Sequence, residues 1–250
     1  MAKLSFMERA FNRLSGLFGL GYVLRKIPQT NPFTVRWAKQ QLNLKEDYHK
    51  LLFSGFCLQK LIDDHNFETV LDIGSGDGTH SAILQDHGKA VTQIDYGKSV
   101  YYRRHSENVQ SHRGDYLEYS FDQQFDAIWA SHVLEHQPNP NLFLKKTFND
   151  LKTGGILAIT VPPLKHDVVG GHVTLWNSGL LLYQLVLAGF DCHHASVLSY
   201  GYNISVIVEK KSFRLPELSY DSGDIALLGP YLPKGCDRDG FDGNIQWLDW

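Results

Sequence analysis

Short apolar runs alternate with amphipathic stretches through the middle of this chain. The apolar runs are typical of strands buried on both faces, and strands are expected at residues 68–73, 89–95, 109–112, 125–131 and 156–161. Between them, apolar residues recur at three- and four-residue steps, which predicts helices at residues 79–87, 97–107 and 139–152. Another helical pattern, from about residue 45 to residue 65, precedes the first strand. Such alternation predicts a parallel sheet with right-handed crossovers and helices on both faces.

The pattern changes after residue 177. Residues 178–188 form an apolar helical segment that stops at Gly189, and strands are expected near residues 193–199 and 203–209. The turn around Gly201 predicts an antiparallel hairpin. Residues 211–250 contain three prolines and several glycines but also two tryptophans, so we expect this tail to pack on the domain instead of remaining free.

The most informative stretch is residues 70–80, with the sequence VLDIGSGDGTH. It reads as a buried strand that ends in a glycine turn and opens a helix at Thr79. Glycines permit backbone angles closed to other residues and leave room for a ligand beside the main chain. A dinucleotide fold spaces them as G-x-G-x-x-G to seat a pyrophosphate, whereas here the third glycine comes one residue early. The spacing favours a cofactor that places an amino acid and a ribose against the loop.

Asp95 ends the next expected strand, about 20 residues after the glycine loop, where a carboxylate can accept both ribose hydroxyls. The loop and this carboxylate together predict a nucleoside-bearing cofactor. The alternative is a tight turn and a solvent-facing acid in an α/β protein without a cofactor.

Composition narrows the class of partner. A chain of 250 residues suits one α/β domain with extensions. The net charge of −3 argues against a nucleic-acid partner, because a protein binds phosphates through clustered Lys and Arg. The three cysteines, Cys57, Cys192 and Cys236, show no C-x-x-C spacing, which favours reduced thiols and a cytoplasmic location.

Residues 1–44 are expected to form a helical extension, because apolar residues recur along a mostly positive segment at positions 4, 7, 11, 14 and 18. No stretch there approaches the ~20 apolar residues that span a bilayer, and no cleavage site of a signal peptide follows it. We favour a helix that packs on its own domain. The alternatives are a helix lying on the inner face of the membrane or docking a glycosyltransferase partner.

Residues 51–209 resemble the class I methyltransferases that use S-adenosyl-L-methionine. VLDIGSGDG resembles their first motif, QIDYG the second and GDYLEYSF the third, and residues 125–162 resemble their fourth strand through the fifth. That last segment, with its LEH and GG elements, is similar to the branch that methylates small molecules and sugars. The resemblance implies a methyltransferase domain at residues 45–210, built as a Rossmann-like, mostly parallel seven-stranded sheet with helices on both faces and an antiparallel final hairpin.

The resemblance also implies a set of cofactor contacts. The methionine part of S-adenosylmethionine is expected against Asp72, Gly74, Ser75 and Gly76, with Ser131 bonding its amino-acid portion. Asp95 is expected to bind the ribose and Tyr96 to stack on adenine. Asp115 and Tyr116 match the position that reads the adenine amino group.

Transfer of a methyl group to a hydroxyl needs a base, and His suits this role near neutral pH. The candidates that follow the fourth and fifth expected strands are His132, His136, His166 and His172. His172 is the first choice, because its stretch GGHVTLW resembles the acceptor region of the family. His136 is the second candidate, with ordering of its loop as the structural interpretation. No metal is expected; the alternative is a site built from His132 and His136 with Glu135 or Asp167.

These observations predict an O-methyltransferase with a small-molecule or sugar acceptor. A sugar unit of a bacterial surface polysaccharide is the first candidate, because Trp176, Tyr183, Tyr200 and Tyr202 offer rings for stacking. The alternatives are a methyltransferase of a quinone, lipid or natural product, and an inactive methyltransferase-like binding partner. The glycine spacing argues against an NAD oxidoreductase. The sequence leaves the oligomeric state open.

Overall fold

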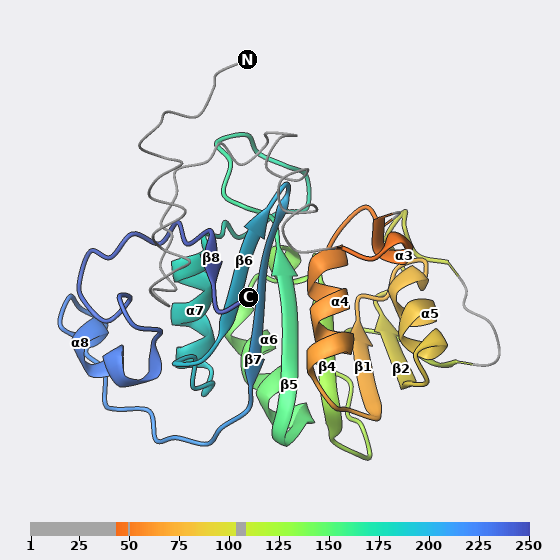
Figure 1. Cartoon of the computed structure of the whole chain (residues 1–250), viewed down its shortest axis with the longest axis horizontal. Coiled ribbons are helices and arrows are strands. Elements are labelled where there is room, and N and C mark those ends of the chain that lie inside the picture. Colours follow the sequence, from red (N-terminus) through yellow and green to blue (C-terminus); the bar gives the residue numbers. More distant parts are fainter. Residues whose placement is uncertain (1–43, 50, 104–108) are drawn as a thin grey trace.

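A computed structural model describes residues 44–49, 51–103 and 109–250 (Figure 1). Within these residues, one eight-stranded sheet has the order β3-β2-β1-β4-β5-β7-β6-β8. The strands are β1 (Thr69–Ile73), β2 (Ala90–Asp95), β3 (Gln110–Arg113), β4 (Phe125–Ser131), β5 (Leu151–Val161), β6 (Ser196–Tyr200), β7 (Asn203–Glu209) and β8 (Trp247–Leu248). The first five are parallel to one another, which confirms the predicted parallel sheet.

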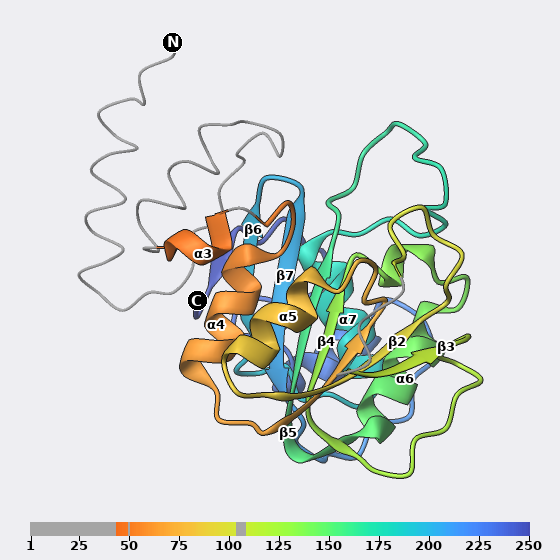
Figure 2. The same ribbon diagram turned by 90° about the vertical axis from the view of Figure 1, so that its right-hand side faces the viewer.

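Helices cover both faces of the sheet, as Figure 2 shows. They are α3 (Glu46–His49), α4 (Gly55–Asp64), α5 (Thr79–Asp86), α6 (Pro140–Asp150), α7 (Ser178–Leu187) and α8 (Asp224–Leu228), with short 3-10 helices η1 (Leu134–His136) and η2 (Gly229–Tyr231). Helices α4 and α5 pack on one face, where Leu58, Leu61 and Leu84 join a buried cluster with Trp129. Helices α6 and α7 pack on the other, where a larger apolar cluster forms.

The sheet closes with the expected antiparallel hairpin. β7 runs antiparallel to β5 and to β6, and Tyr200 pairs with Asn203 across the turn. The expectation of seven strands was wrong by one, because β8 adds an eighth strand at the β6 edge. Its two residues are too few for alternation to reveal a strand in the sequence.

The C-terminal tail contributes to the core around α7. Leu232, Ile245 and Leu248 are buried in the larger cluster. The Gly179 N–H donates to the carbonyl of Gly243 at 2.8 Å, and a Cβ on Gly179 would lie 2.6 Å from the Gly243 Cα. This close approach explains the glycine at position 179, and a Cβ on Gly243 would lie 2.7 Å from Asn177 Oδ1. The domain boundaries after residues 44 and 210 stay predictions.

Two helix predictions were wrong. The pattern at residues 45–65 divides into α3 and α4, because Ser54 adopts a left-handed φ of 61° just before α4. Residues 97–103 form bends and turns instead of a helix; Gly97 there has a φ of 71°. The rest of that segment and the predicted N-terminal helical extension lie outside the described residues.

Candidate functional site

The glycine loop lies at the carboxyl end of β1, between that strand and α5. Gly74, Gly76 and Gly78 all have positive φ angles, at 72°, 55° and 80°. A Cβ on Gly74 would lie 2.3 Å from Cγ2 of Val133, so the loop packs directly on the turn after β4. The loop therefore presents main-chain atoms where parallel strands end, which is where ligands bind in such sheets.

Asp95 connects this loop to the end of β2. One of its carboxylate oxygens accepts the Gly76 N–H at 3.0 Å, and the other accepts the Gly97 N–H at 2.7 Å. The side chain is 8% exposed. Each oxygen keeps a second lone pair, so the carboxylate can bind a pair of hydroxyls while it holds the loop.

Asp72 lies beneath the loop and is buried in β1. Burial raises the pKa of its carboxyl to about 7. The hydrogen bond that Ser81 Oγ donates at 2.5 Å lowers the pKa, but by less than burial raises it. A carboxyl that titrates near neutral pH under a glycine loop can carry either charge state beside a ligand. Ser75, in the loop itself, is also buried.

The remaining predicted cofactor residues fall into two groups. Tyr96 is 55% exposed beside Asp95, and Asp115 accepts the Leu117 N–H at 2.9 Å at the start of the turn after β3. Tyr116, however, is buried; it donates to Asp150 at 2.7 Å and its ring packs on Phe143. The structure thus brings Asp95, Tyr96 and Asp115 to one edge and turns the Tyr116 side chain into the core.

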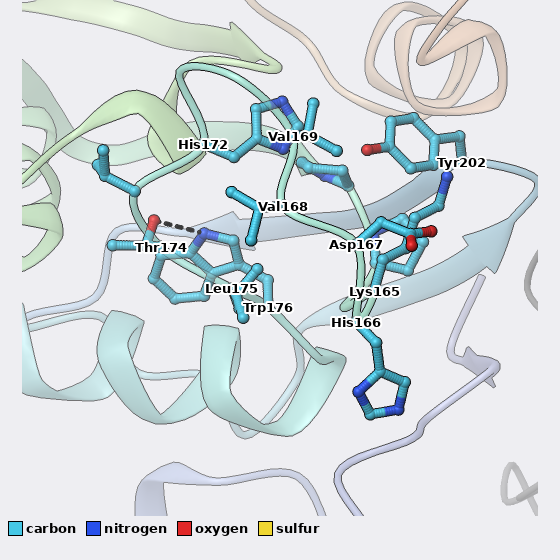
Figure 3. Close-up of a pocket in the computed structure, with 13 residues that line it drawn as sticks. Lys165, His166, Asp167, Val168, Val169, His172, Thr174, Leu175, Trp176 and Tyr202 are labelled. Atoms are coloured by element: carbon cyan, nitrogen blue, oxygen red, sulfur yellow. Dashed lines mark hydrogen bonds between the residues drawn. The ribbon is translucent and has the colours of Figure 1, made fainter.

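The loop after β5 forms a pocket at the same end of the sheet (Figure 3). Its cavity of about 200 Å³ is lined mainly by apolar and aromatic side chains, including Val168, Val173, Leu175, Trp176 and Tyr202. Lys165 lies over the Tyr202 ring, with Nζ 4.2 Å from the centroid. Val168 is 96% exposed, so the loop offers apolar surface as well as a cavity.

His172 and His136 meet at the edge of this pocket. Their ring centroids lie 5.0 Å apart with the planes at 80°. Burial lowers the pKa of His172 from its ordinary value, which favours the neutral ring that a base requires. The loop that carries His172 rests on η1: the Val173 N–H donates to the Glu135 carbonyl at 2.9 Å, and His136 Nδ1 lies 2.7 Å from the Gly171 carbonyl. Of the other predicted candidates, His166 also lines the pocket.

His132 lies directly after β4 with a left-handed φ of 54°, a conformation uncommon outside glycine. Its ring forms a cluster with those of Phe53 and Tyr202, at centroid distances of 4.4 and 6.0 Å. Its Nε2 lies 3.0 Å from Asn203 Oδ1. Next to it, Ser131 Oγ lies 2.6 Å from Ser54 Oγ. These contacts join three distant segments above the carboxyl ends of β4 and β5.

Sequence reasoning did not select Ser54, Phe53 or Asn203, although all three contact the candidate site. None belongs to a pattern with a chemical meaning in one dimension. Ser54 adopts the left-handed conformation that glycine usually occupies, so no glycine in the sequence marks this turn. Only the packing of α4 against the β6–β7 hairpin brings these residues to the end of β4.

The chain matches a family model described as a methyltransferase domain over residues 71–159. Residues 71–159 are a class I methyltransferase domain. Domains of this class use S-adenosylmethionine, which confirms the resemblance seen in the sequence. The matched residues include the glycine loop, Asp95 and His132.

Curated relatives of this domain carry a more specific name. The chain is 25% identical over 164 residues to a ubiquinone biosynthesis O-methyltransferase from Psychrobacter arcticus, covering 60% of each chain. It is 29% identical over 134 residues to the enzyme of the same name from Coxiella burnetii, covering 51% of this chain and 48% of that one. The chain therefore matches only about half to three-fifths of the length of these relatives.

Solved structures confirm the fold. A 1,6-didemethyltoxoflavin-N1-methyltransferase from Burkholderia thailandensis aligns with a TM-score of 0.54 at 16% identity, covering 85% of this chain and 93% of that one. The cyclase SpnF aligns with a TM-score of 0.50 at 18% identity, covering 68% and 86%. Because the second protein is named as a cyclase, the fold alone does not identify the reaction. Among the described residues, no helix has the length and apolar character needed to cross a membrane.

Proposed function

We propose that the protein is an S-adenosylmethionine-dependent O-methyltransferase that acts on a small aromatic acceptor of the quinone-precursor class, carrying a phenolic hydroxyl. The observation that carries the proposal is the pocket after β5, an apolar and aromatic cavity beside His172 at the same end of the sheet as the glycine loop. The methyltransferase domain and the named O-methyltransferase relatives support it.

The residues present suit the cofactor. Asp95 keeps free lone pairs for two ribose hydroxyls while its other lone pairs hold Gly76 and Gly97. Gly74 and Gly76 expose main-chain atoms to the amino-acid portion of the cofactor. Tyr96 offers an exposed ring for the adenine, and the Asp115 carboxylate offers an acceptor for the adenine amino group. When bound, the cofactor supplies an electrophilic methyl group; the protein must hold the acceptor in line with it.

The lining of the pocket favours an aromatic acceptor over a sugar. A sugar presents several hydroxyls that need hydrogen-bonding partners. Eight of the thirteen lining residues are Val, Leu, Pro, Trp or Tyr, and the polar ones are Lys165, His166, Asp167, His172 and Thr174. A volume of about 200 Å³ lies below the roughly 300–1,000 Å³ of sites that enclose a drug-sized ligand. The cavity therefore suits one ring, with any long substituent directed past the exposed Val168 and Val173. The polysaccharide expectation becomes the second candidate.

His172 is proposed as the base that accepts the hydroxyl proton. Its ring lines the pocket, and burial lowers its pKa, which favours the neutral form that a base requires. With cofactor and acceptor bound, His172 would take the hydroxyl proton as the acceptor oxygen bonds the methyl carbon and the bond from that carbon to the sulfonium sulfur breaks, so the products would be an ether and the neutral thioether. His136 would hold the loop in place through the Gly171 carbonyl.

The test is methyl transfer from labelled S-adenosylmethionine to a panel of acceptors. A catechol with a short prenyl chain is expected to be methylated on oxygen, and a hexose glycoside is not. Methylation of the hexose alone would restore the sugar proposal. Tight binding of S-adenosylhomocysteine without transfer to any hydroxylated acceptor would favour the inactive binding partner instead.

A further inference from the structure

The Glu135 carboxylate is buried without a hydrogen bond. Its side chain is fully buried in η1, and neither carboxylate oxygen has a hydrogen-bond partner among the residues that the structure describes. Two ring nitrogens lie beside it instead: His132 Nδ1 is 3.3 Å from Oε1, and His136 Nε2 is 3.8 Å from the same oxygen. A carboxylate removed from water is strongly unfavourable unless a positive charge compensates it. This cluster therefore needs a positive group beside Oε1.

The hydrogen bonds of the two imidazoles direct lone pairs toward this carboxylate. His136 Nδ1 lies 2.7 Å from the Gly171 carbonyl, and since a carbonyl only accepts, the neutral ring carries its proton there and leaves Nε2 bare. His132 Nε2 lies 3.0 Å from Asn203 Oδ1, an oxygen placed by the bond from Asn203 Nδ2 to the Tyr200 carbonyl. This nitrogen therefore donates, and Nδ1 of the neutral ring is bare. An imidazole that donates from one nitrogen to a fixed oxygen and turns the other to a site has the arrangement of a metal ligand.

We propose that Glu135, His132 and His136 bind a divalent transition-metal ion of the zinc type, between Glu135 Oε1 and the two bare nitrogens. Two nitrogen donors select such an ion over Mg²⁺ or Ca²⁺, which prefer oxygen ligands. Zinc bonds of about 2.0–2.2 Å at tetrahedral angles separate neighbouring ligand atoms by roughly 3.3–3.6 Å. Of the two separations from Oε1, the one of 3.3 Å agrees with this range and the one of 3.8 Å lies just above it.

The 3-10 helix η1 brings these ligands together. The sequence favoured no metal, and its alternative placed His132 and His136 one α-helical turn apart with Glu135 or Asp167 as a further ligand. In the structure both Glu135 and His136 belong to η1, and His132 comes two residues before it. Asp167 lines the pocket. It does not belong to the described group of side chains whose ligand atoms all lie within 4.8 Å of one another, which is Glu135, His136 and His172.

His172 approaches the proposed site from the loop after β5, and its ring also lines the pocket (Figure 3). Three protein ligands leave a fourth position open, which is the pattern of catalytic zinc sites. An acceptor hydroxyl at that position would give its proton to His172 more readily, because a divalent cation stabilises negative charge on the oxygen. The methyl carbon leaves the sulfonium sulfur as it bonds this oxygen, and the ion keeps its charge throughout. This role in methyl transfer rests on the proposed function, but binding of the ion does not.

The direct test is retention of Zn²⁺ by the full-length protein, which is stripped with a chelator, exposed to Zn²⁺ and dialysed. We expect one retained ion per chain, and Co²⁺ in its place should give the visible absorption of a low-coordinate site with nitrogen ligands. Glu135→Gln and His136→Ala should each weaken binding roughly 100-fold or more, beyond the 10–100-fold that loss of an outer-shell partner typically causes. The wild-type measurements need no variant that could fail to fold.

An exposed histidine pair provides the matched control. His193 and His194 have ring centroids 4.6 Å apart and could bind Zn²⁺ adventitiously. The double variant His193→Ala/His194→Ala should retain the ion, and so should His172→Ala. Wild type that retains no Zn²⁺, or equal binding by Glu135→Gln, overturns the proposal. So does loss of the ion from the double variant, or from His172→Ala, since His172 would then be a ligand instead of the base.

Kinetics then test the role of the ion. Its removal should lower kcat roughly tenfold or more, and added Zn²⁺ should restore kcat. The affinity for S-adenosylhomocysteine should stay within about twofold, because that ligand is expected at the glycine loop and Asp95. Unchanged kcat after removal refutes the catalytic role. If no hydroxylated acceptor is methylated, the proposed function fails, whereas the Zn²⁺ stoichiometry and the Co²⁺ spectrum still decide whether the site exists.

Discussion

Replacing Gly74 by alanine separates two costs that the glycine loop avoids. Gly74 has a φ of 72°, and a Cβ there would lie 2.3 Å from Cγ2 of Val133. The left-handed conformation costs an L-residue about 1–2 kcal/mol, and a contact this short adds about 1–3 kcal/mol of overpacking. Gly74→Ala should therefore lower the free energy of unfolding by about 2–5 kcal/mol.

Gly88 provides the matched control. It has nearly the same φ, 74°, but a Cβ on it would meet no atom within 4 Å. Gly88→Ala should therefore cost only the conformational term of about 1–2 kcal/mol. Urea denaturation of both variants gives the difference, provided that the slope with denaturant is unchanged.

A double variant identifies the steric part. Val133→Ala removes the methyl group that Gly74→Ala would strike, so the two substitutions should couple favourably by about 1–3 kcal/mol in a double-mutant cycle. If Gly74→Ala costs no more than Gly88→Ala, or if the cycle shows no coupling, the packing of the glycine loop on the turn after β4 is not as described.

Three further outcomes are expected. Asp95→Ala should weaken binding of S-adenosylhomocysteine by about 1–3 kcal/mol in calorimetry, because a charged acceptor is lost; the exposed control Asp122→Ala should bind as the wild type does. His172→Ala should lower turnover roughly 10²–10⁴-fold in the methyl-transfer assay with cofactor affinity nearly intact; full turnover would remove it from the chemistry. Burial lowers the pKa of His80 from 6.5 to about 4 in the folded protein. The unfolded chain therefore binds a proton that the folded protein does not, and the free energy of unfolding should decrease as the pH falls from about 6.5 to 4. His80→Gln should flatten that dependence in urea titrations at several pH values; an unchanged slope would show that His80 does not cause it.

Much of the sheet could be predicted from the sequence, because its central strands are continuous apolar runs bounded by turn residues. β4 begins and ends at the predicted residues, and β1, β2 and α6 lie within one or two residues of them. The β6–β7 hairpin follows from the turn around Gly201. β8 could not be predicted, since its two residues pair with β6 only after the tail has crossed α7.

The candidate site divides in the same way. The glycine loop and Asp95 carry local signals, and the structure brings them together through the Gly76 N–H. Tyr116 belongs to the motif expected at the adenine, but its side chain does not lie there. A tyrosine after a strand can turn to either side, and here its hydroxyl donates to Asp150 in the core. Glu135 shows the reverse case. Its surroundings, with two imidazoles anchored by Gly171 and Asn203, depend on residues more than 30 positions away.

The central claim, that this domain binds S-adenosylmethionine across the loop of Gly74 and Gly76 and at Asp95, is tested most directly by calorimetric titration of the full-length protein with S-adenosylhomocysteine. The account predicts one site per chain and little or no heat with NAD under the same conditions. Tight binding of NAD, or an affinity for S-adenosylhomocysteine that Asp95→Ala leaves unchanged, would contradict it.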